Sequence, residues 1–222
     1  MRVLVTGAGG FIGSHVVRAL LDRGDAVHAV VRPGPVVSRL EEVRERIDLV
    51  SCDLLDPELP EHLDRISPDV CIHLAWFTDP TWYLGDVEGN LRSLEASVRL
   101  LRLLARLPQA RVVLAGTCLE EAGGPPGANL YPTCKKALHG LSDELRQIGH
   151  STVCAHIFYL YGPHEHEARL IPTIIRRLLR QEEAHVIDGS YARDYLHVED
   201  VASALCAVAG GGVQGTIDIC SG

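Results

Sequence analysis

Short runs of apolar, often β-branched residues alternate with longer segments of helical periodicity along most of the chain. Strands are predicted at Arg2–Thr6, Ala26–Val31, Ile47–Cys52, Val70–Leu74, Arg111–Ala115 and Thr152–Ile157. Helices are predicted near Ile12–Arg23, Ser38–Arg46, Val87–Leu107 and Tyr131–Ile148. The strands are apolar enough to be covered on both faces, as in a parallel sheet with helices on each side. We therefore expect an α/β fold with a doubly wound parallel sheet.

The alternation loosens after Ile157. The pattern there predicts a turn at Tyr161-Gly162-Pro163, helices at Ala168–Arg180 and Glu199–Ala209, and short extended pieces at Val186–Ile187 and Tyr195–Val198. We expect residues 1–157 to form the main domain. Residues 158–222 are expected to form a small lobe that is interleaved with the end of the sheet.

The composition and net charge argue against some classes of binding partner. The 222 residues are 46% hydrophobic and 23% charged, as in a soluble globular protein with one good core. The net charge of −8, with basic residues scattered among acids, argues against a nucleic-acid surface. The apolar stretch Leu100–Leu107 is too short and too charged to span a bilayer, and the first residues look like a strand rather than a signal peptide. We expect neither a nucleic-acid nor a membrane partner.

The cysteines and histidines suggest no metal chemistry at this stage. Seven cysteines are dispersed without Cys-x-x-Cys spacing, and we interpret them as reduced, mostly buried thiols of a cytoplasmic protein. His164 and His166 are close in sequence but have no further ligands at a suitable spacing, so no metal site is predicted.

A glycine-rich loop follows the first predicted strand directly and opens the first helix. Its sequence is Thr6-Gly7-Ala8-Gly9-Gly10-Phe11-Ile12-Gly13. Backbone amides and the helix dipole converge in such a loop where a pyrophosphate can sit. Gly7 allows the tight turn, Gly10 lets a phosphate approach the backbone, and Gly13 permits close packing of helix on strand. The loop predicts a dinucleotide-binding, Rossmann-type domain, and a glycine-rich turn without a ligand is the plain alternative.

The residues after the second and third strands bear on which dinucleotide binds. An NAD-preferring site usually has an acidic residue at the end of the second strand, but Val31 and Arg32 stand there. The Arg32 guanidinium suits a 2′-phosphate, which favours NADP, with NAD as the alternative if Arg32 is only a solvated loop residue. Asp53 follows the third strand, where its carboxylate can meet the adenine amino group or can simply close a turn.

Tyr131 and Lys135 form the candidate catalytic pair. A spacing of four residues places both on one face of a helix, and the chain has only one other lysine, Lys136. A compact ammonium beside a phenol lowers the phenol pKa, which prepares it to exchange protons in an alcohol–ketone interconversion. The alternative is a Tyr and a Lys on a solvated helix face.

Further motifs occur in order along nearly the whole chain. They are His73-Leu74-Ala75, Asn90, Thr117, Leu160-Tyr161-Gly162-Pro163, Arg193-Asp194-Tyr195-Leu196-His197-Val198-Glu199-Asp200, and the closing Gly215-Thr216-Ile217-Asp218-Ile219-Cys220-Ser221-Gly222. Together with the glycine loop and the Tyr–Lys pair, these motifs resemble the extended short-chain dehydrogenase/reductase family, in its nucleotide-sugar epimerase, dehydratase and reductase branch. The resemblance implies an enzyme that uses NADP or NAD on a nucleotide-sugar substrate.

The resemblance also implies roles for individual residues. Tyr131 would exchange a proton with the sugar oxygen, Thr117 would hydrogen-bond that oxygen, and Lys135 would hold the nicotinamide ribose and lower the Tyr131 pKa. Arg193 would grip the nucleotide diphosphate, unless it forms a surface ion pair with Asp194. The predicted cofactor-binding residues are Gly7, Gly10, Phe11, Ile12, Gly13, Arg32, Asp53, Leu54, Leu74, Ala75 and Lys135.

Within the branch, the residues after Thr117 disfavour dehydration. Sugar 4,6-dehydratases have Asp-Glu where this chain has Cys118-Leu119. A 4-ketoreductase acting on a 4-keto-6-deoxy sugar nucleotide is favoured by the NADP signal, with a 4-epimerase or epimerase-reductase as the alternative. His164 resembles the histidine acid of GDP-fucose synthase and is a candidate substrate-binding residue, but the cysteine of that enzyme falls at Leu119. A dinucleotide-binding protein without turnover is the remaining alternative.

Two further expectations concern the assembly and the substrate lobe. The helices near Val87–Leu107 and Tyr131–Ile148 have broad apolar stripes, and in the family such helices pair across a two-fold axis, so we expect a homodimer. The connection from Thr117 to Tyr131 is short for the family, and relatives continue beyond Gly222. We therefore expect a substrate lobe that lacks part of the family pattern, whether through a natural deletion or because the sequence is a fragment.

Overall fold

The computed structural model describes residues 1–34, 38–122, 129–184, 189 and 192–222. Its centre is a seven-stranded sheet with the order β3-β2-β1-β4-β5-β6-β9, in which every neighbouring pair is parallel. The strands are β1 (Arg2–Thr6), β2 (Ala26–Val31), β3 (Asp48–Ser51), β4 (Val70–His73), β5 (Arg111–Thr117), β6 (Thr152–Ile157) and β9 (Gly215–Ile219). The order reverses beside β1, as in Rossmann folds, so the predicted fold class is confirmed.

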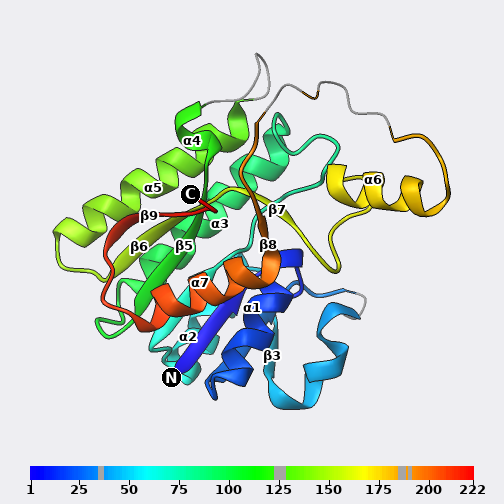
Figure 1. The fold of residues 1–222 in the computed structure, drawn as a ribbon. Helices are drawn as coiled ribbons and strands as arrows, with labels where there is room; N and C mark the ends of the chain where they lie inside the picture. Colours follow the sequence, from blue (N-terminus) through cyan, green and yellow to red (C-terminus); the bar gives the residue numbers. More distant parts are fainter. Residues whose placement is uncertain (35–37, 123–128, 185–188, 190–191) are drawn as a thin grey trace.

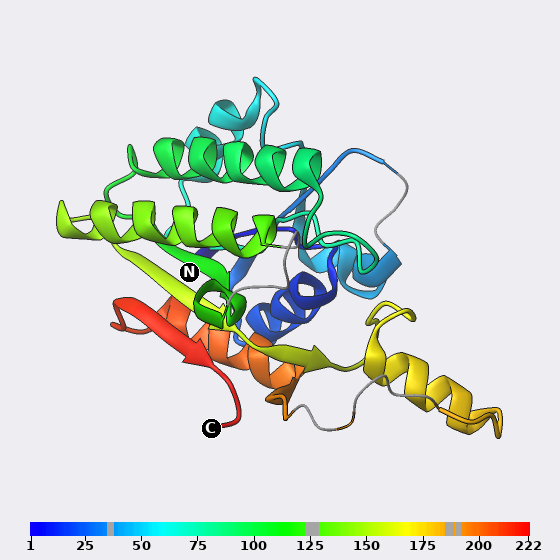
Figure 2. The same ribbon diagram turned by 90° about the horizontal axis from the view of Figure 1, so that it is seen from above.

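Helices cover both faces of this sheet (Figures 1 and 2). On one face lie α1 (Phe11–Asp22) and α7 (Val198–Gly210), which pack against each other. On the other face lie α2 (Leu59–Ile66), α3 (Val87–Leu104) and α5 (Leu130–Gln147), with α3 packed along α5. The helices therefore shield both faces of the apolar strands from solvent.

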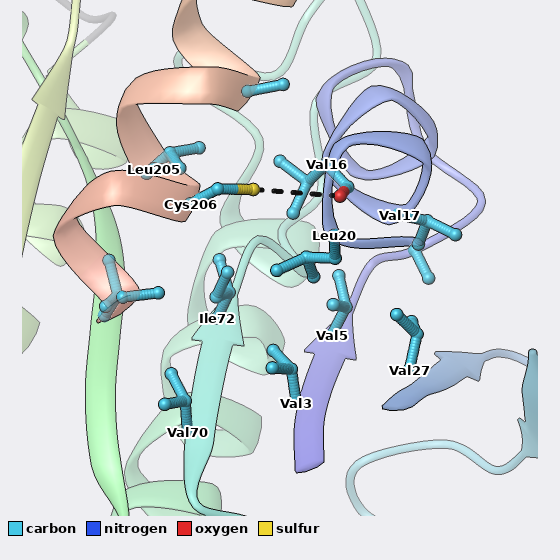
Figure 3. Close-up of a cluster of buried hydrophobic side chains, with 14 of the residues drawn as sticks. Val3, Val5, Val16, Val17, Leu20, Val27, Val70, Ile72, Leu205 and Cys206 are labelled. Atoms are coloured by element: carbon cyan, nitrogen blue, oxygen red, sulfur yellow. Dashed lines mark hydrogen bonds between the residues drawn. The ribbon is translucent and has the colours of Figure 1, made fainter. Parts of the chain in front are cut away.

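Each face of the sheet has its own apolar core because successive strand residues point to opposite sides. In β1, Val3 and Val5 belong to the cluster beneath α1 and α7, whereas Leu4 belongs to the cluster beneath α2, α3 and α5. Figure 3 shows the first cluster, where Leu20 of α1 and Leu205 of α7 lie over the strands. Full burial of such a side chain typically contributes ~1.5–3 kcal/mol, so both faces hold the sheet firmly.

The later part of the chain adds a smaller unit at the carboxyl edge of the sheet. Strands β7 (Tyr159–Tyr161) and β8 (Tyr195–His197) form a separate parallel pair. Between them α6 (Leu170–Leu179) stands away from the body and has no buried residue (Figure 2). The chain then returns through α7 to β9 beside β6. The division at residue 157 stays a prediction.

Several elements differ from the sequence expectation. The segment Ser38–Arg46 is a 3₁₀ helix, η1, rather than an α-helix; its buried Leu40 and Val43 are three residues apart, which suits three residues per turn. Helix α2 was not predicted, although its buried Leu59, Leu63 and Ile66 have helical spacing. Nor were the short helix α4 (Leu119–Ala122) and the strand β9 predicted. The predicted piece Val186–Ile187 lies outside the described residues.

Candidate active site

The glycine loop is built so that other residues would not fit. Gly7 has φ +69°, and a Cβ atom there would lie 2.8 Å from the backbone nitrogen of Ala75. A Cβ atom on Gly13 would lie 2.1 Å from the Gly7 carbonyl oxygen. Helix α1 then begins after Gly10, which caps it without a side-chain hydrogen bond. The first-turn amides, which have no partner within a helix, are thus left to face an anion, and the loop fits a dinucleotide pyrophosphate.

A buried hydrogen-bond chain fixes the loop after β4 against this glycine loop. The Ser97 hydroxyl donates to the Ser93 carbonyl (2.6 Å), so it must accept from His73 Nε2 (2.8 Å). His73 Nδ1 therefore accepts from the Thr6 hydroxyl (2.7 Å), whose oxygen accepts from the Ala75 amide (3.3 Å). Burial lowers the pKa of His73 to about 3, with a smaller contribution from the charge of Lys135. The imidazole is neutral, in one tautomer, and ties β1, β4 and α3 together.

The three predicted catalytic residues come together at the carboxyl end of β5. Thr117 ends β5, and Tyr131 and Lys135 lie one turn apart at the start of α5. All three side chains are buried, and the Thr117 hydroxyl lies close enough to the Tyr131 phenol to act on its pKa. Lys135 Nζ donates to the Ala115 carbonyl of β5 (2.8 Å), which fixes the helix on the strand. The amide of Tyr131 donates to the Leu84 carbonyl (3.0 Å).

The electrostatics differ in one respect from the sequence expectation. Burial raises the pKa of Tyr131, with the nearby Tyr83 adding to the effect and the hydrogen bond from Thr117 opposing it. Burial lowers the pKa of Lys135 to about 8. The Lys135 ammonium lies 4.0 Å from the centre of the Trp76 ring and 5.9 Å from that of Tyr131. Desolvation of the phenol thus sets the direction of the Tyr131 pKa in this structure, and the lowering by Lys135 stays a prediction.

An aromatic wall that the sequence analysis missed covers the Tyr–Lys pair. Trp76 packs edge-on to Tyr131, and so does Tyr83, with ring centres 6.2 and 5.0 Å away. Asn90 holds both in place: its Oδ1 accepts from Trp76 Nε1 (3.0 Å) and its Nδ2 donates to the Tyr83 carbonyl (2.6 Å) and the Asp86 carbonyl (2.7 Å). The aromatic-rich stretch directly after His73-Leu74-Ala75 was the available signal.

Two arginines lie over tyrosine rings on the side of β7 and β8. The Arg193 guanidinium lies 4.7 Å from the ring centre of Tyr159. The Asp194 carboxylate accepts hydrogen bonds from the amide and the hydroxyl of Ser221 (2.9 and 2.8 Å). Asp194 is therefore engaged by Ser221 and not by the ion pair considered for Arg193. Arg169, which the sequence analysis did not single out, lies 5.0 Å from the ring centre of Tyr83.

The other predicted ligand residues lie around this edge. His164 is exposed at φ +70°; its carbonyl accepts from Arg39, and its ring lies 6.0 Å from that of His15, on the side of α1. Arg32 is exposed directly after β2. Asp53 accepts from the Leu55 amide (2.9 Å), which is the turn arrangement considered as its alternative.

The predicted apolar contacts have ordinary structural positions. Leu54 is part of the core beneath α3, and Leu74 packs at the margin of the core on the α1 side. Phe11 and Ile12 are half-buried in the first turn of α1. Their roles toward a cofactor stay predictions.

Comparison with known proteins decides the family. The sequence profile of the NAD dependent epimerase/dehydratase family matches residues 3–220. The chain belongs to this family. It is 30% identical over 243 aligned positions to UDP-glucose 4-epimerase of Mycolicibacterium smegmatis, an alignment that covers 95% of this chain and 74% of that protein.

Solved structures of the family agree with this fold. MoeE5, in complex with UDP-glucose and NAD, is 30% identical and superposes with a TM-score of 0.81 over 99% of this chain and 76% of its own. UDP-N-acetylglucosamine 4-epimerase from Methanobrevibacter ruminantium M1, in complex with UDP-N-acetylmuramic acid, superposes with a TM-score of 0.86. That likeness covers 98% of this chain and 76% of the other, and at 23% identity it concerns the fold.

Membership in this family confirms the resemblance drawn from the motifs and the expectation that the chain is an enzyme of the NAD-dependent, nucleotide-sugar class. The choice between reduction and epimerisation, and the choice of NADP over NAD, are finer questions that membership leaves to experiment. Among the described residues, no helix is both long and apolar enough to cross a membrane.

Proposed function

We propose that the protein is an NAD-dependent 4-epimerase of a nucleotide-linked hexose. The observation that carries this proposal is the joining of Thr117, Tyr131 and Lys135 at the end of β5, beside a glycine loop shaped for a pyrophosphate. The likeness to UDP-glucose 4-epimerase and to MoeE5 supports a nucleotide-linked hexose as substrate and NAD as cofactor.

The chain offers a cofactor site along the carboxyl edge of the sheet. The first-turn amides of α1 would hold the pyrophosphate, and Gly7 and Gly13 leave room for the close approach of backbone to phosphate. Lys135, at the start of α5, would hold the nicotinamide ribose. Bound NAD supplies the hydride acceptor and donor for the sugar carbon.

The proton chemistry falls to Tyr131 and Thr117. The raised pKa of Tyr131 keeps the phenol protonated at neutral pH, which suits the acid that returns a proton to a ketone oxygen. In the opposite direction the Tyr131 phenolate, whose charge Lys135 would compensate, would accept the sugar hydroxyl proton and become the neutral phenol. Thr117, whose hydroxyl lies beside the phenol, would hold the same sugar oxygen in line.

A second candidate function is reduction of a 4-keto-6-deoxy sugar nucleotide with NADPH. Arg32 favours it, because an exposed guanidinium after β2 suits a 2′-phosphate. The fate of the cofactor separates the two functions: reduction consumes NADPH in proportion to product, whereas epimerisation leaves no net change in the cofactor. Tighter binding of NADP than NAD, reversed in Arg32→Ala, would favour the reductase.

The test uses UDP-glucose and UDP-galactose with NAD, followed by chromatography of the sugar nucleotides. Tyr131→Phe should lower kcat by ~10²–10⁴ and leave NAD affinity nearly unchanged, because the phenol transfers the proton. Tyr161→Phe, a half-exposed tyrosine of β7, is the matched control and should retain activity. Wild-type turnover in Tyr131→Phe would refute the mechanism. A wild-type protein that binds NAD but converts no sugar nucleotide would favour the binding-only alternative.

We also propose that the protein is a cytoplasmic homodimer joined through α3 and α5. Leu91 and Val98 of α3 are 50% and 38% exposed, and Leu141 of α5 is 46% exposed, although these helices pack side by side (Figure 2). An apolar face of this kind suits the same face of a second copy. Light scattering at micromolar concentration should give twice the chain mass of 24.2 kDa, and Leu91→Glu should shift it toward the monomer. A monomeric mass for the wild type contradicts the dimer.

A further inference from the structure

Four side chains with metal-binding atoms meet beneath α5, outside the catalytic trio. Cys154 and His156 are two residues apart on β6 and therefore project from the same face of the sheet. His139 reaches them from α5, one helical turn after Lys135, and Glu120 comes from α4. One ligand atom of each of the four lies within 4.8 Å of the others. No metal site was predicted from the sequence, because these four residues lie on three separate elements of the chain.

The distances among three of these atoms match a metal-centred arrangement. Glu120 Oε2 lies 3.0 Å from His139 Nδ1 and 3.3 Å from His156 Nε2. The two imidazole nitrogens lie 3.3 Å from each other. A tetrahedral Zn²⁺ ion with Zn–N and Zn–O bonds of ~2.0–2.1 Å places its ligand atoms about 3.3–3.4 Å apart. The three atoms therefore form one face of a zinc tetrahedron, and the Cys154 sulfur is available for the fourth position.

Three of the four ligands are also oriented by a hydrogen-bond partner outside the cluster. His156 Nδ1 lies 3.2 Å from the Asp218 carboxylate, and His139 Nε2 lies 2.7 Å from the Thr216 hydroxyl, both on β9. Metal-bound histidines typically donate their other ring N–H to such partners, which fixes the tautomer. The second oxygen of Glu120, Oε1, accepts from the amide of Thr117 (2.8 Å). His139, His156 and Glu120 thus each turn one atom to the cluster and engage the other polar atom elsewhere.

A glycine leaves the room that the cluster occupies. Gly116 of β5 is the register partner of His156. A Cβ atom on Gly116 would lie 2.7 Å from His156 Cδ2 and 2.8 Å from both Cys154 Sγ and Glu120 Oε1. Gly116 has no positive φ that would require glycine, so the space itself is its structural reason.

A metal-free network is the competing interpretation of these contacts. In that network His156 would donate from Nδ1 to Asp218 and accept at Nε2 from His139 Nδ1–H, which also faces Glu120 Oε2. With a metal, His156 and His139 would each donate one N–H outward and turn a lone pair inward. The near contact of two ring nitrogens beside a carboxylate and a thiol favours the metal.

We propose that Glu120, His139, Cys154 and His156 bind one divalent transition-metal ion, Zn²⁺, in a closed tetrahedral site. Two imidazoles, a carboxylate and a thiolate are ligands that Zn²⁺ accepts. Four protein ligands leave no open position, so the ion is structural. It fastens α5 to α4 and β6 one turn after Lys135. Glu120 also accepts from the amide of Thr117, which links the site to β5.

The first test is metal binding by the whole wild-type chain. Chelator-treated protein is titrated with Zn²⁺ against a chromophoric competitor, and we expect one tight equivalent. Co²⁺ in place of Zn²⁺ should give the visible bands of tetrahedral cobalt together with a thiolate-to-metal charge-transfer band, which Cys154→Ala should remove. A wild-type protein that binds no Zn²⁺ overturns the proposal and leaves the hydrogen-bonded network.

Variants then locate the site. His139→Gln should weaken Zn²⁺ binding by more than the ~10–100-fold that loss of an outer partner costs, and Asp218→Asn, an outer partner, should fall within that range. His62→Gln is the matched control, a histidine on α2 outside the cluster. Asp218 is on the exposed side of β9, so its variant tests the site even if His139→Gln fails to fold. Unchanged Zn²⁺ affinity in both variants would place the metal elsewhere and refute the proposal.

Discussion

The Lys135 ammonium is buried at a cost to stability, and this cost can be measured. Its side chain is 5% exposed, and burial lowers its pKa from 10.5 to about 8. The folded protein therefore binds this proton less tightly than the unfolded chain does. Lys135→Met keeps a long, unbranched side chain but removes the charge, so it removes the dependence on this proton.

The sign and size of the effect follow from the two pKa values. Between pH 8 and pH 10.5 the unfolded chain keeps the proton that the folded protein has lost, so the free energy of unfolding rises with pH in this interval. At ~1.4 kcal/mol per pKa unit, the difference between 10.5 and about 8 corresponds to about 3 kcal/mol. Below pH 8 both states hold the proton, and the whole penalty is present. Lys135 should therefore destabilise the protein most at neutral pH.

The assay is urea unfolding of wild type and Lys135→Met from pH 7 to about pH 10.5, with chelator present in both so that the metal state is the same. The wild-type free energy of unfolding minus that of the variant should rise by about 3 kcal/mol across the upper part of this range. Lys136→Met, on the exposed side of the same helix, is the matched control and should show no such rise. A flat difference between wild type and Lys135→Met would refute the reasoning.

Three further predictions concern other parts of the site. Gly13→Ala should abolish NAD binding in calorimetry, because its Cβ would lie 2.1 Å from the Gly7 carbonyl oxygen. Gly140→Ala is the contrasting variant: nothing lies within 4 Å of the added atom, so it should stabilise α5 by ~0.5–1 kcal/mol. Asn90→Ala should lower the free energy of unfolding by on the order of 3 kcal/mol, because it leaves the Trp76 N–H and the Tyr83 carbonyl without their partner and removes one of the two hydrogen bonds to the Asp86 carbonyl. A loss below about 1 kcal/mol would contradict this. Burial raises the pKa of Glu165 from 4.5 to about 7, so the folded state holds this proton more tightly and stability should fall as pH rises through that interval. Thermal unfolding of Glu165→Gln should lack this component of the fall.

The parts of the site that the sequence predicts well are those whose geometry is set by one short segment of the chain. The glycine loop is a local turn whose conformation each glycine sets, and Tyr131 and Lys135 meet because four residues make about one helical turn. The position of Thr117 could be predicted because it stands at the carboxyl end of a predicted strand. Parallel strands meet at one edge, so the end of β5 had to lie near the glycine loop.

The parts that the sequence did not predict depend on the register between distant segments. Glu120, His139 and His156 lie on α4, α5 and β6, and only the pairing of Gly116 with His156 brings the strand histidine beneath the helix. The raised pKa of Tyr131 was not foreseen for a related reason: the sequence shows the charge of Lys135 four residues away, but not how deeply the phenol is buried. The spacing of residues along one helix or strand can be predicted from the sequence, whereas the desolvation of a side chain depends on the packing of the whole fold.

One face of α5 connects these observations. Tyr131, Lys135 and His139 follow each other at intervals of four residues, so all three point from the helix toward the sheet. Each requires a different neighbour there: the hydroxyl of Thr117, the carbonyl of Ala115, and the cluster around Glu120. A shift of α5 along its axis would break all three contacts together, because the helix moves as a rigid rod. The proposed metal therefore lies where it would resist that shift, one turn from a lysine whose own burial opposes folding.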